Sequence, residues 1–232
     1  MIGIYNYTVF LTYMSLCSAG IGIFVSLSGM GHPYIGSFFL LFCGLCDAFD
    51  GRVARSKKDR TAVEKNYGIQ IDSLSDMVAF GVLPACIGTA MLRVSPGIPH
   101  IYSLYHTGFT EALITALLYI VLLFYILAAL IRLAYFNVME EQRQHTESAV
   151  LKSYTGLPVT SASLIFPAVL LLQFIVPFDV TYIYFVFVIL TGLAFLCRVR
   201  IPKPGLCGIL VMVGAGALEF SLFIIGEYLR NH

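Results

Sequence analysis

Four aspartates stand out in a chain that is otherwise largely apolar. Asp47 and Asp50 are three residues apart near the end of one apolar segment, and Asp72 and Asp76 are four residues apart at the start of another. Residues at these spacings project from one stripe of a helix. Because the stretch between the two pairs is short, we expect the two helices to be antiparallel neighbours whose ends bring four carboxylates together.

Four carboxylates beside apolar segments need a compensating cation. Like charges repel at close range, and ionised groups in a membrane are costly. Oxygen ligands without His or Cys suit Mg²⁺ or Mn²⁺ better than Zn²⁺. We therefore expect two divalent ions, in an arrangement that serves displacement at phosphorus. The expected ligands are Asp47, Asp50, Asp72 and Asp76. Arg55 is a further candidate to pair with one of these carboxylates.

The composition places these aspartates in a membrane protein. The 232 residues are 59% hydrophobic and only 12% charged, whereas soluble domains carry about 25% charged residues. An apolar run of about 20 residues spans the hydrocarbon core of a bilayer as a helix. We predict an all-α polytopic membrane helix bundle of about seven transmembrane helices, or six to eight if the last segments merge or split. The predicted segments are 7–29, 34–52, 68–92, 112–138, 158–176, 180–197 and 205–228.

The whole chain, residues 1–232, is expected to form a single integral membrane domain. The first apolar segment lacks a basic start and a convincing cleavage site, which favours a retained helix over a signal peptide. Basic residues gather in alternate loops, at 52–65, 139–156 and 198–203. Because cytoplasmic loops carry the excess of Lys and Arg, we expect the N-terminus and the four aspartates to face the cytoplasm. No nucleic acid is expected as a partner.

Small residues accompany the aspartates. Gly51, Ala54 and Gly68 lack bulk where the two helices are expected to converge. Such positions let a nucleotide or pyrophosphate approach the backbone closely. Ordinary helix packing in a membrane is the alternative explanation for them.

The combined pattern resembles a known signature. It reads D-x-x-D-G-x-x-A-R from Asp47 to Arg55, then twelve residues, then G-x-x-x-D-x-x-x-D from Gly68 to Asp76. This pattern resembles the signature of the CDP-alcohol phosphatidyltransferases. The gap in the family is usually about eight or nine residues, so we expect a longer cytoplasmic turn within 56–67. Three further stretches are similar to the serine-accepting branch of this family: DSLSDMVAFGVLPA at 72–85, RLAYFNV at 132–138 and YTGLP at 154–158.

The resemblance implies an enzyme that transfers the phosphatidyl group of CDP-diacylglycerol to the hydroxyl of L-serine and releases CMP. It implies that Asp47, Asp50 and Asp72 bind metal, and that Asp76 touches metal and acts as general base. It also implies a CDP-binding part made of Gly51, Ala54, Arg55 and Gly68.

Two alternatives stay open at this point. One is the same chemistry on another acceptor, either glycerol 3-phosphate or inositol phosphate. Such acceptors carry an extra phosphate and should need more basic groups near the pocket than the sequence offers. The other is a divalent-cation transporter that uses the aspartates as an ion site. Transporter sites usually lie near the midplane between internal repeats, whereas these aspartates lie at the ends of their segments and no repeat is visible.

A serine acceptor brings a carboxylate that a guanidinium or ammonium can bind. Arg132 lies inside an apolar run, where ionisable residues indicate function, although a snorkelling arginine is the alternative. Asn137 and Lys152 are weaker candidates for serine binding, since polar helix ends and loop lysines are common. Glu219 lies midway along the last apolar segment, where it either pairs inside the bundle or marks the contact of an expected homodimer. Glycines of this segment indicate close helix packing: Gly205, Gly208, Gly214 and Gly216.

Overall fold

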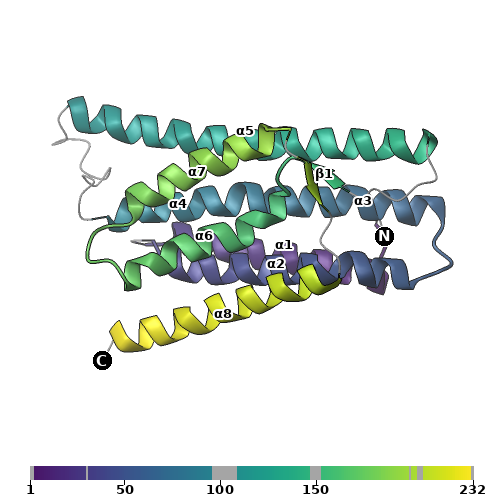
Figure 1. The fold of residues 1–232 in the computed structure, drawn as a ribbon, viewed down its shortest axis with the longest axis horizontal. Coiled ribbons are helices and arrows are strands. Elements are labelled where there is room, and N and C mark those ends of the chain that lie inside the picture. The colour runs from purple at the N-terminus through teal and green to yellow at the C-terminus, as the bar shows by residue number, and fades with distance from the viewer. Residues whose placement is uncertain are drawn as a thin grey trace.

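The computed structural model describes residues 3–29, 31–95, 109–146, 153–198, 200–202 and 206–230. Within these ranges almost every element is a helix, which confirms the predicted all-α fold (Figure 1). Two short strands, β1 (Ser153–Thr155) and β2 (Arg200–Pro202), pair antiparallel with Tyr154 opposite Ile201.

The first half of the chain forms the helices that carry the aspartates. A 3-10 turn, η1 (Tyr7–Val9), leads into α1 (Phe10–Leu27), and α2 (Pro33–Ser56) runs back beside it. One continuous rod follows, made of α3 (Ala62–Asp76), the π-helical segment η2 (Met77–Val82) and α4 (Leu83–Val94).

The second half packs against this rod and against α2. It consists of α5 (Phe109–Thr146), η4 (Val159–Ser161), α6 (Ala162–Leu171), η5 (Leu172–Phe174), α7 (Thr181–Leu196) and α8 (Leu206–Arg230). In Figure 1 α5 lies along one side of the bundle and α8 along the other, with the α3–α4 rod between them. The N-terminus and the α2–α3 turn lie at one end, and the C-terminus lies at the opposite end.

The described helices confirm a polytopic membrane bundle. Four of them are long and apolar enough to cross a membrane: Tyr7–Leu27, Pro33–Ser56, Ala62–Val94 and Ala112–Gln142. Three shorter apolar helices follow at Val159–Phe174, Thr181–Leu196 and Val213–Gly226. Each of the seven predicted segments therefore corresponds to one helical run. Leu117, Leu123 and Leu127 of α5 are about half exposed or more, as expected of a helix face that meets lipid.

Two boundaries differ from the sequence prediction. The α2–α3 turn covers only residues 57–61, so the longer turn predicted within 56–67 is wrong. The extra residues lengthen α3 instead, because Thr61 caps its start in a capping box with Glu64. At the other end, α5 continues to Thr146, well beyond the predicted 138, since residues 139–146 include good helix formers such as Met, Glu and Gln.

Two buried tyrosines fix the core around the start of α4. Tyr125 and Tyr184 are fully buried. Pro84 has no N–H to offer the carbonyl of Phe80 one turn earlier, and the Tyr125 hydroxyl donates to that carbonyl at 2.6 Å. The Tyr184 hydroxyl donates to the carbonyl of Pro84 at 2.7 Å. These bonds tie α5 and α7 to the rod and satisfy backbone groups that water does not reach.

Candidate active site

The α2–α3 hairpin brings three carboxylates together. Oxygen atoms of Asp47, Asp50 and Asp72 all lie within 4.8 Å of one another. Asp50 is buried, and the other two side chains are half-buried. The predicted convergence of the two helices is therefore confirmed for these three residues. Their close approach favours a bound cation, because ionised carboxylates at this separation repel one another.

Asp76 lies one turn further along α3 and is not part of this close group. It is the last residue before η2, where the helix widens and the N–H of Leu83 bonds to the carbonyl of Val78. Such wide turns often occur at functional sites. The neighbouring Ser75 hydroxyl donates to the carbonyl of Thr12 at 3.2 Å, which fixes this part of α3 against α1. The roles of Asp76 as metal ligand and general base stay predictions.

Guanidinium groups lie against the small residues of the hairpin. A Cβ atom added to Gly51 would lie 3.3 Å from Nη1 of Arg55, and one added to Gly68 would lie only 2.6 Å from Nη2 of Arg60. Arg60 Nη1 also donates to the carbonyl of Ala54 at 3.4 Å. A side chain at Gly68 would therefore force Arg60 to move. Arg60 is not among the residues predicted from the sequence, and the one available signal for it was its position in the unusually long gap of the signature.

Glu64 fixes the turn between the two helices. Its carboxylate accepts hydrogen bonds from Lys57 Nζ at 2.5 Å and from the Thr61 N–H at 2.9 Å. Asn6 Nδ2, from the start of the chain, donates to the same carboxylate at 3.0 Å. The turn is thus held from both helices and from the N-terminal segment.

Asn137 contacts Ser73, the residue that follows Asp72 on α3. Ser73 Oγ donates to Asn137 Oδ1 at 3.0 Å, and Asn137 Nδ2 lies 2.8 Å from Ser73 Oγ. Because Ser73 directly follows Asp72, this contact joins α5 to the part of α3 that carries the aspartates. Of the other serine-binding candidates, Lys152 lies outside the described residues.

Arg132 is buried by protein, with only 5% of its surface exposed. Its Nε donates to the carbonyl of Leu157 at 3.3 Å, and its guanidinium lies 5.3 Å from the ring centre of Phe136. Gly156 has a positive φ of 83°, and a Cβ atom there would lie 3.1 Å from Arg132 Nε. Burial of this kind does not fit a snorkelling arginine, whose charged head reaches water.

Comparison with known proteins agrees with this geometry. A family model described as CDP-alcohol phosphatidyltransferase matches residues 5–199. The chain belongs to the CDP-alcohol phosphatidyltransferase family. The predicted resemblance is thus confirmed, and an enzyme is favoured over the divalent-cation transporter that the sequence left open.

Several curated proteins are similar to the chain, and each carries the name CDP-diacylglycerol–serine O-phosphatidyltransferase. The protein from Saccharomyces cerevisiae is 32% identical over 136 residues, which are 58% of this chain and 41% of the relative. The protein from Helicobacter pylori strain 26695 is 27% identical over 77% of this chain and 68% of its own length. The protein from Methanocaldococcus jannaschii is 27% identical over 76% and 69%. The match therefore spans less than half of the yeast relative and about two thirds of the other two.

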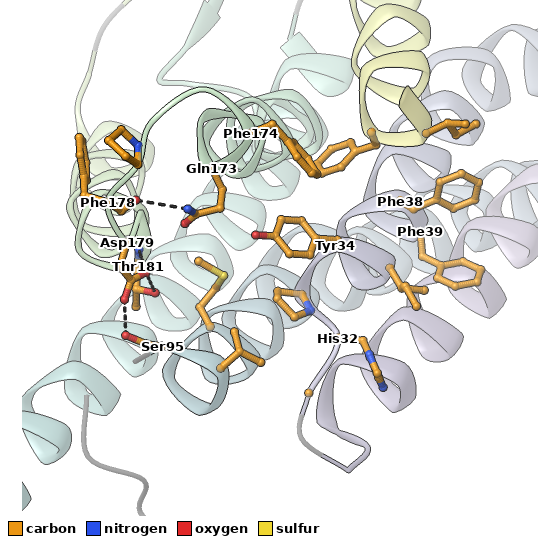
Figure 2. A pocket seen from close by; sticks show the side chains of 18 residues that line it. His32, Tyr34, Phe38, Phe39, Ser95, Gln173, Phe174, Phe178, Asp179 and Thr181 are labelled. Atoms are coloured by element: carbon orange, nitrogen blue, oxygen red, sulfur yellow. Dashed lines mark hydrogen bonds between the residues drawn. The ribbon is translucent and has the colours of Figure 1, made fainter. Parts of the chain in front are cut away.

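A cavity of about 1070 Å³ lies at the other end of the bundle and is separate from the site of the family signature. It is lined by the start of α2, the end of α4 and the connection between η5 and α7, and none of the four aspartates borders it. Figure 2 shows its aromatic wall, which includes Tyr34 and Phe174, and a polar side where Asp179 accepts hydrogen bonds from Ser95 and Thr181.

Proposed function

We propose that this chain transfers the phosphatidyl group of CDP-diacylglycerol to the hydroxyl of L-serine, giving phosphatidylserine and CMP. The observation that carries the proposal is the convergence of three carboxylates within 4.8 Å at one end of an apolar helix bundle. Membership of the CDP-alcohol phosphatidyltransferase family supports the reaction class. The shared name of the curated relatives supports serine as the acceptor.

Two Mg²⁺ or Mn²⁺ ions are the proposed cofactors. Asp47, Asp50 and Asp72 fit such ions, because they offer several carboxylate oxygens and no His or Cys. Asp76, one turn away on α3, is the proposed fourth ligand. When bound, the ions would neutralise the diphosphate of the donor and polarise its phosphoryl oxygens.

Side chains of the protein carry out the remaining steps of the proposed reaction. The serine hydroxyl oxygen attacks the phosphorus that carries diacylglycerol, the bond from this phosphorus to CMP breaks, and CMP leaves with the bonding electron pair. Asp76 takes the hydroxyl proton, since a positioned carboxylate makes the hydroxyl a better nucleophile. Gly51, Ala54, Arg55 and Gly68 are the proposed CDP-binding residues, and the guanidinium groups of Arg55 and Arg60 lie against Gly51 and Gly68.

Arg132, Asn137 and Lys152 are the proposed serine-binding residues. The contact between Asn137 and Ser73 beside Asp72 supports Asn137. For Arg132 the support is a buried guanidinium held against the Gly156–Leu157 segment. A guanidinium binds a carboxylate with two parallel hydrogen bonds, which selects an amino acid over an uncharged alcohol.

We further infer that the single membrane domain presents its site to the cytoplasm and forms a homodimer in the bilayer. The basic residues at the aspartate end support the orientation.

The support for the dimer comes from α8. Gly214, Ala217 and Ser221 form an exposed stripe of small residues on this helix, and such stripes let helices approach closely. Native mass spectrometry of the protein in lipid nanodiscs tests the dimer, which a monomeric species alone would exclude.

The function is tested with purified protein, CDP-diacylglycerol and a panel of acceptors. CMP release is measured with L-serine, glycerol 3-phosphate and inositol phosphate, and the lipid product is identified by mass spectrometry. We expect turnover with serine, loss of turnover in excess chelator, and recovery with Mg²⁺ or Mn²⁺ but poorly with Zn²⁺. Turnover with glycerol 3-phosphate and not with serine would show that the acceptor is wrong while the reaction class stands. Full activity in excess chelator would exclude the metal site.

A further inference from the structure

Arg60 occupies the space between the two halves of the signature. It lies in the turn 57–61, at a position for which the signature specifies no residue. Its Nη1 donates to the carbonyl of Ala54 on α2 at 3.4 Å, and its Nη2 donates to the carbonyl of Glu64 on α3 at 3.3 Å. Nη2 also lies 2.6 Å from the place of a Cβ at Gly68. The guanidinium therefore lies between two small residues that the signature assigns to nucleotide binding.

Within the described chain, the N–H groups of the Arg60 guanidinium have few acceptors, and the hydrogen bonds that they make are long. Arg60 Nε is buried and has no hydrogen-bond partner there. The two Nη contacts are long for N–H···O hydrogen bonds, which centre near 2.9–3.0 Å. The carboxylate of Glu64 does not neutralise Arg60, because Lys57, Thr61 and Asn6 already use it. Each Nη atom carries two N–H groups. The contacts with the carbonyls of Ala54 and Glu64 use one on each atom, so two N–H groups remain for a ligand that supplies acceptor oxygens.

The position of Arg60 is set by the hydrogen bonds of its neighbours. The capping box between Thr61 and Glu64 fixes the first turn of α3 directly after Arg60. The ion pair of Lys57 with Glu64 closes the turn from the other side. Because both flanks are held, the guanidinium is directed between α2 and α3 and does not extend into solvent as a loop arginine usually does.

We propose that Arg60 is a nucleotide-recognition residue that donates the remaining N–H groups of its Nη atoms to acceptor oxygens of the CDP group of the donor lipid. This inference rests on the proposed function. A planar guanidinium presents several donors in a fixed geometry, which suits phosphate or carbonyl oxygens better than an ammonium does.

The test compares Arg60→Ala, Arg60→Lys and the matched control Lys58→Ala. Lys58 lies in the same turn but is exposed, so the control removes the same charge without a contact in the site. Binding of CDP to the full-length protein in nanodiscs is measured by titration calorimetry in the presence of Mg²⁺. We expect Arg60→Ala to weaken CDP binding by about tenfold or more, Arg60→Lys to lie between, and Lys58→Ala to match wild type. The serine KM at saturating CDP-diacylglycerol should stay within about twofold.

Titrations with CMP and with inorganic pyrophosphate locate the contact. If Arg60→Ala loses affinity for CMP but not for pyrophosphate, Arg60 contacts the nucleoside part of the ligand. If it loses affinity for both, Arg60 contacts phosphate.

Thermal unfolding without ligand identifies a variant that fails to fold, in which case Arg60→Gln replaces Arg60→Ala. Unchanged or tighter CDP binding in the folded variant overturns the proposal, because Arg60 then only fastens or blocks the turn. If wild-type protein binds no CDP, the proposed function itself fails, and that outcome is seen before any variant is compared.

Discussion

Asp76 differs from the other three aspartates in its surroundings. Asp47, Asp50 and Asp72 share one space between α2 and α3, whereas Asp76 lies one turn deeper and directly before the π-helical segment. An Asp→Asn substitution affects a metal ligand and a general base in different ways. The ligand loses metal affinity, while the base loses the ability to accept a proton.

We therefore expect Asp50→Asn to lower metal-dependent CDP binding and CMP release together. Asp76→Asn should reduce kcat by roughly 10²–10⁴-fold, the usual size of a general-base contribution, with a much smaller effect on CDP binding. Calorimetry with CDP and a CMP-release assay give the two readouts. Asp59→Asn is the matched control, since Asp59 is an exposed aspartate of the same turn. An equal loss of CDP binding in the Asp50 and Asp76 variants would contradict a separate role for Asp76.

The aspartate cluster could be predicted from the sequence because the spacing of residues on a helix is a local property. Asp47 with Asp50 and Asp72 with Asp76 needed only helical periodicity, and a short connection made the hairpin. Arg60 could not be placed in this way. Its direction depends on where α3 begins, and this depends on a capping interaction inside a charged stretch that carries no hydrophobic signal.

At the level of elements, Asp179 connects two helices at the end of the bundle away from the aspartates. Ser95, directly after α4, donates to its carboxylate, and so do the N–H and hydroxyl of Thr181 at 2.9 and 2.6 Å, at the start of α7. Burial acts to raise the pKa of Asp179, but the hydrogen bonds from Ser95 and Thr181 outweigh it and lower that pKa below its ordinary value. The folded state therefore favours the ionised carboxylate.

This sets the direction of a pH effect. A carboxylate with a lowered folded pKa stabilises the protein above its unfolded pKa, near 3.9 for Asp, and the contribution is lost as the pH falls through the folded value. We expect Asp179→Ala to lower the free energy of unfolding by about 1–2 kcal/mol at neutral pH. The difference from wild type should shrink below about pH 4. Thermal unfolding of both proteins at several pH values measures this difference in stability. A difference that grows as the pH falls would contradict this account.

The predicted apolar segments agree with the helices because a run long enough to span lipid dominates the local sequence. The predicted ends of the segments agree less well with the ends of the helices. The start of α3 and the last turns of α5 are polar, so hydropathy does not mark them. The π-helical segment after Asp76 has no sequence signal of its own, because its sequence, MVAFGV, suits an ordinary helix interior as well.

For the whole molecule, the two ends of the bundle are chemically unlike. One end holds the aspartates and the basic α2–α3 turn, and the other holds the aromatic cavity (Figures 1 and 2). Helix α5 has 38 residues, or roughly 57 Å at 1.5 Å per residue, against a hydrocarbon core of about 30 Å. Its polar last turns therefore extend out of the bilayer on the aspartate side.

The orientation of the molecule is testable at the turn. Lys58→Cys places a thiol at an exposed position beside the site. A membrane-impermeant thiol reagent should label this variant in inside-out vesicles and not in sealed right-side-out vesicles. Labelling of the protein without the added cysteine is measured as the background, since Cys17 and Cys197 are also exposed. Labelling from the outside only would reverse the proposed orientation.

The contact between Asn6 and Glu64 has a practical consequence at the bench. The first described residues are part of the scaffold that holds the α2–α3 turn, where nucleotide binding is proposed. Asn6 donates to the Glu64 carboxylate that caps α3, and the hydroxyl of Tyr13 lies 2.8 Å from that of Tyr67. A purification handle or fluorescent protein fused close to Asn6 competes with these contacts. The C-terminus, at the far end of the bundle (Figure 1), is the place where such a fusion leaves the site undisturbed.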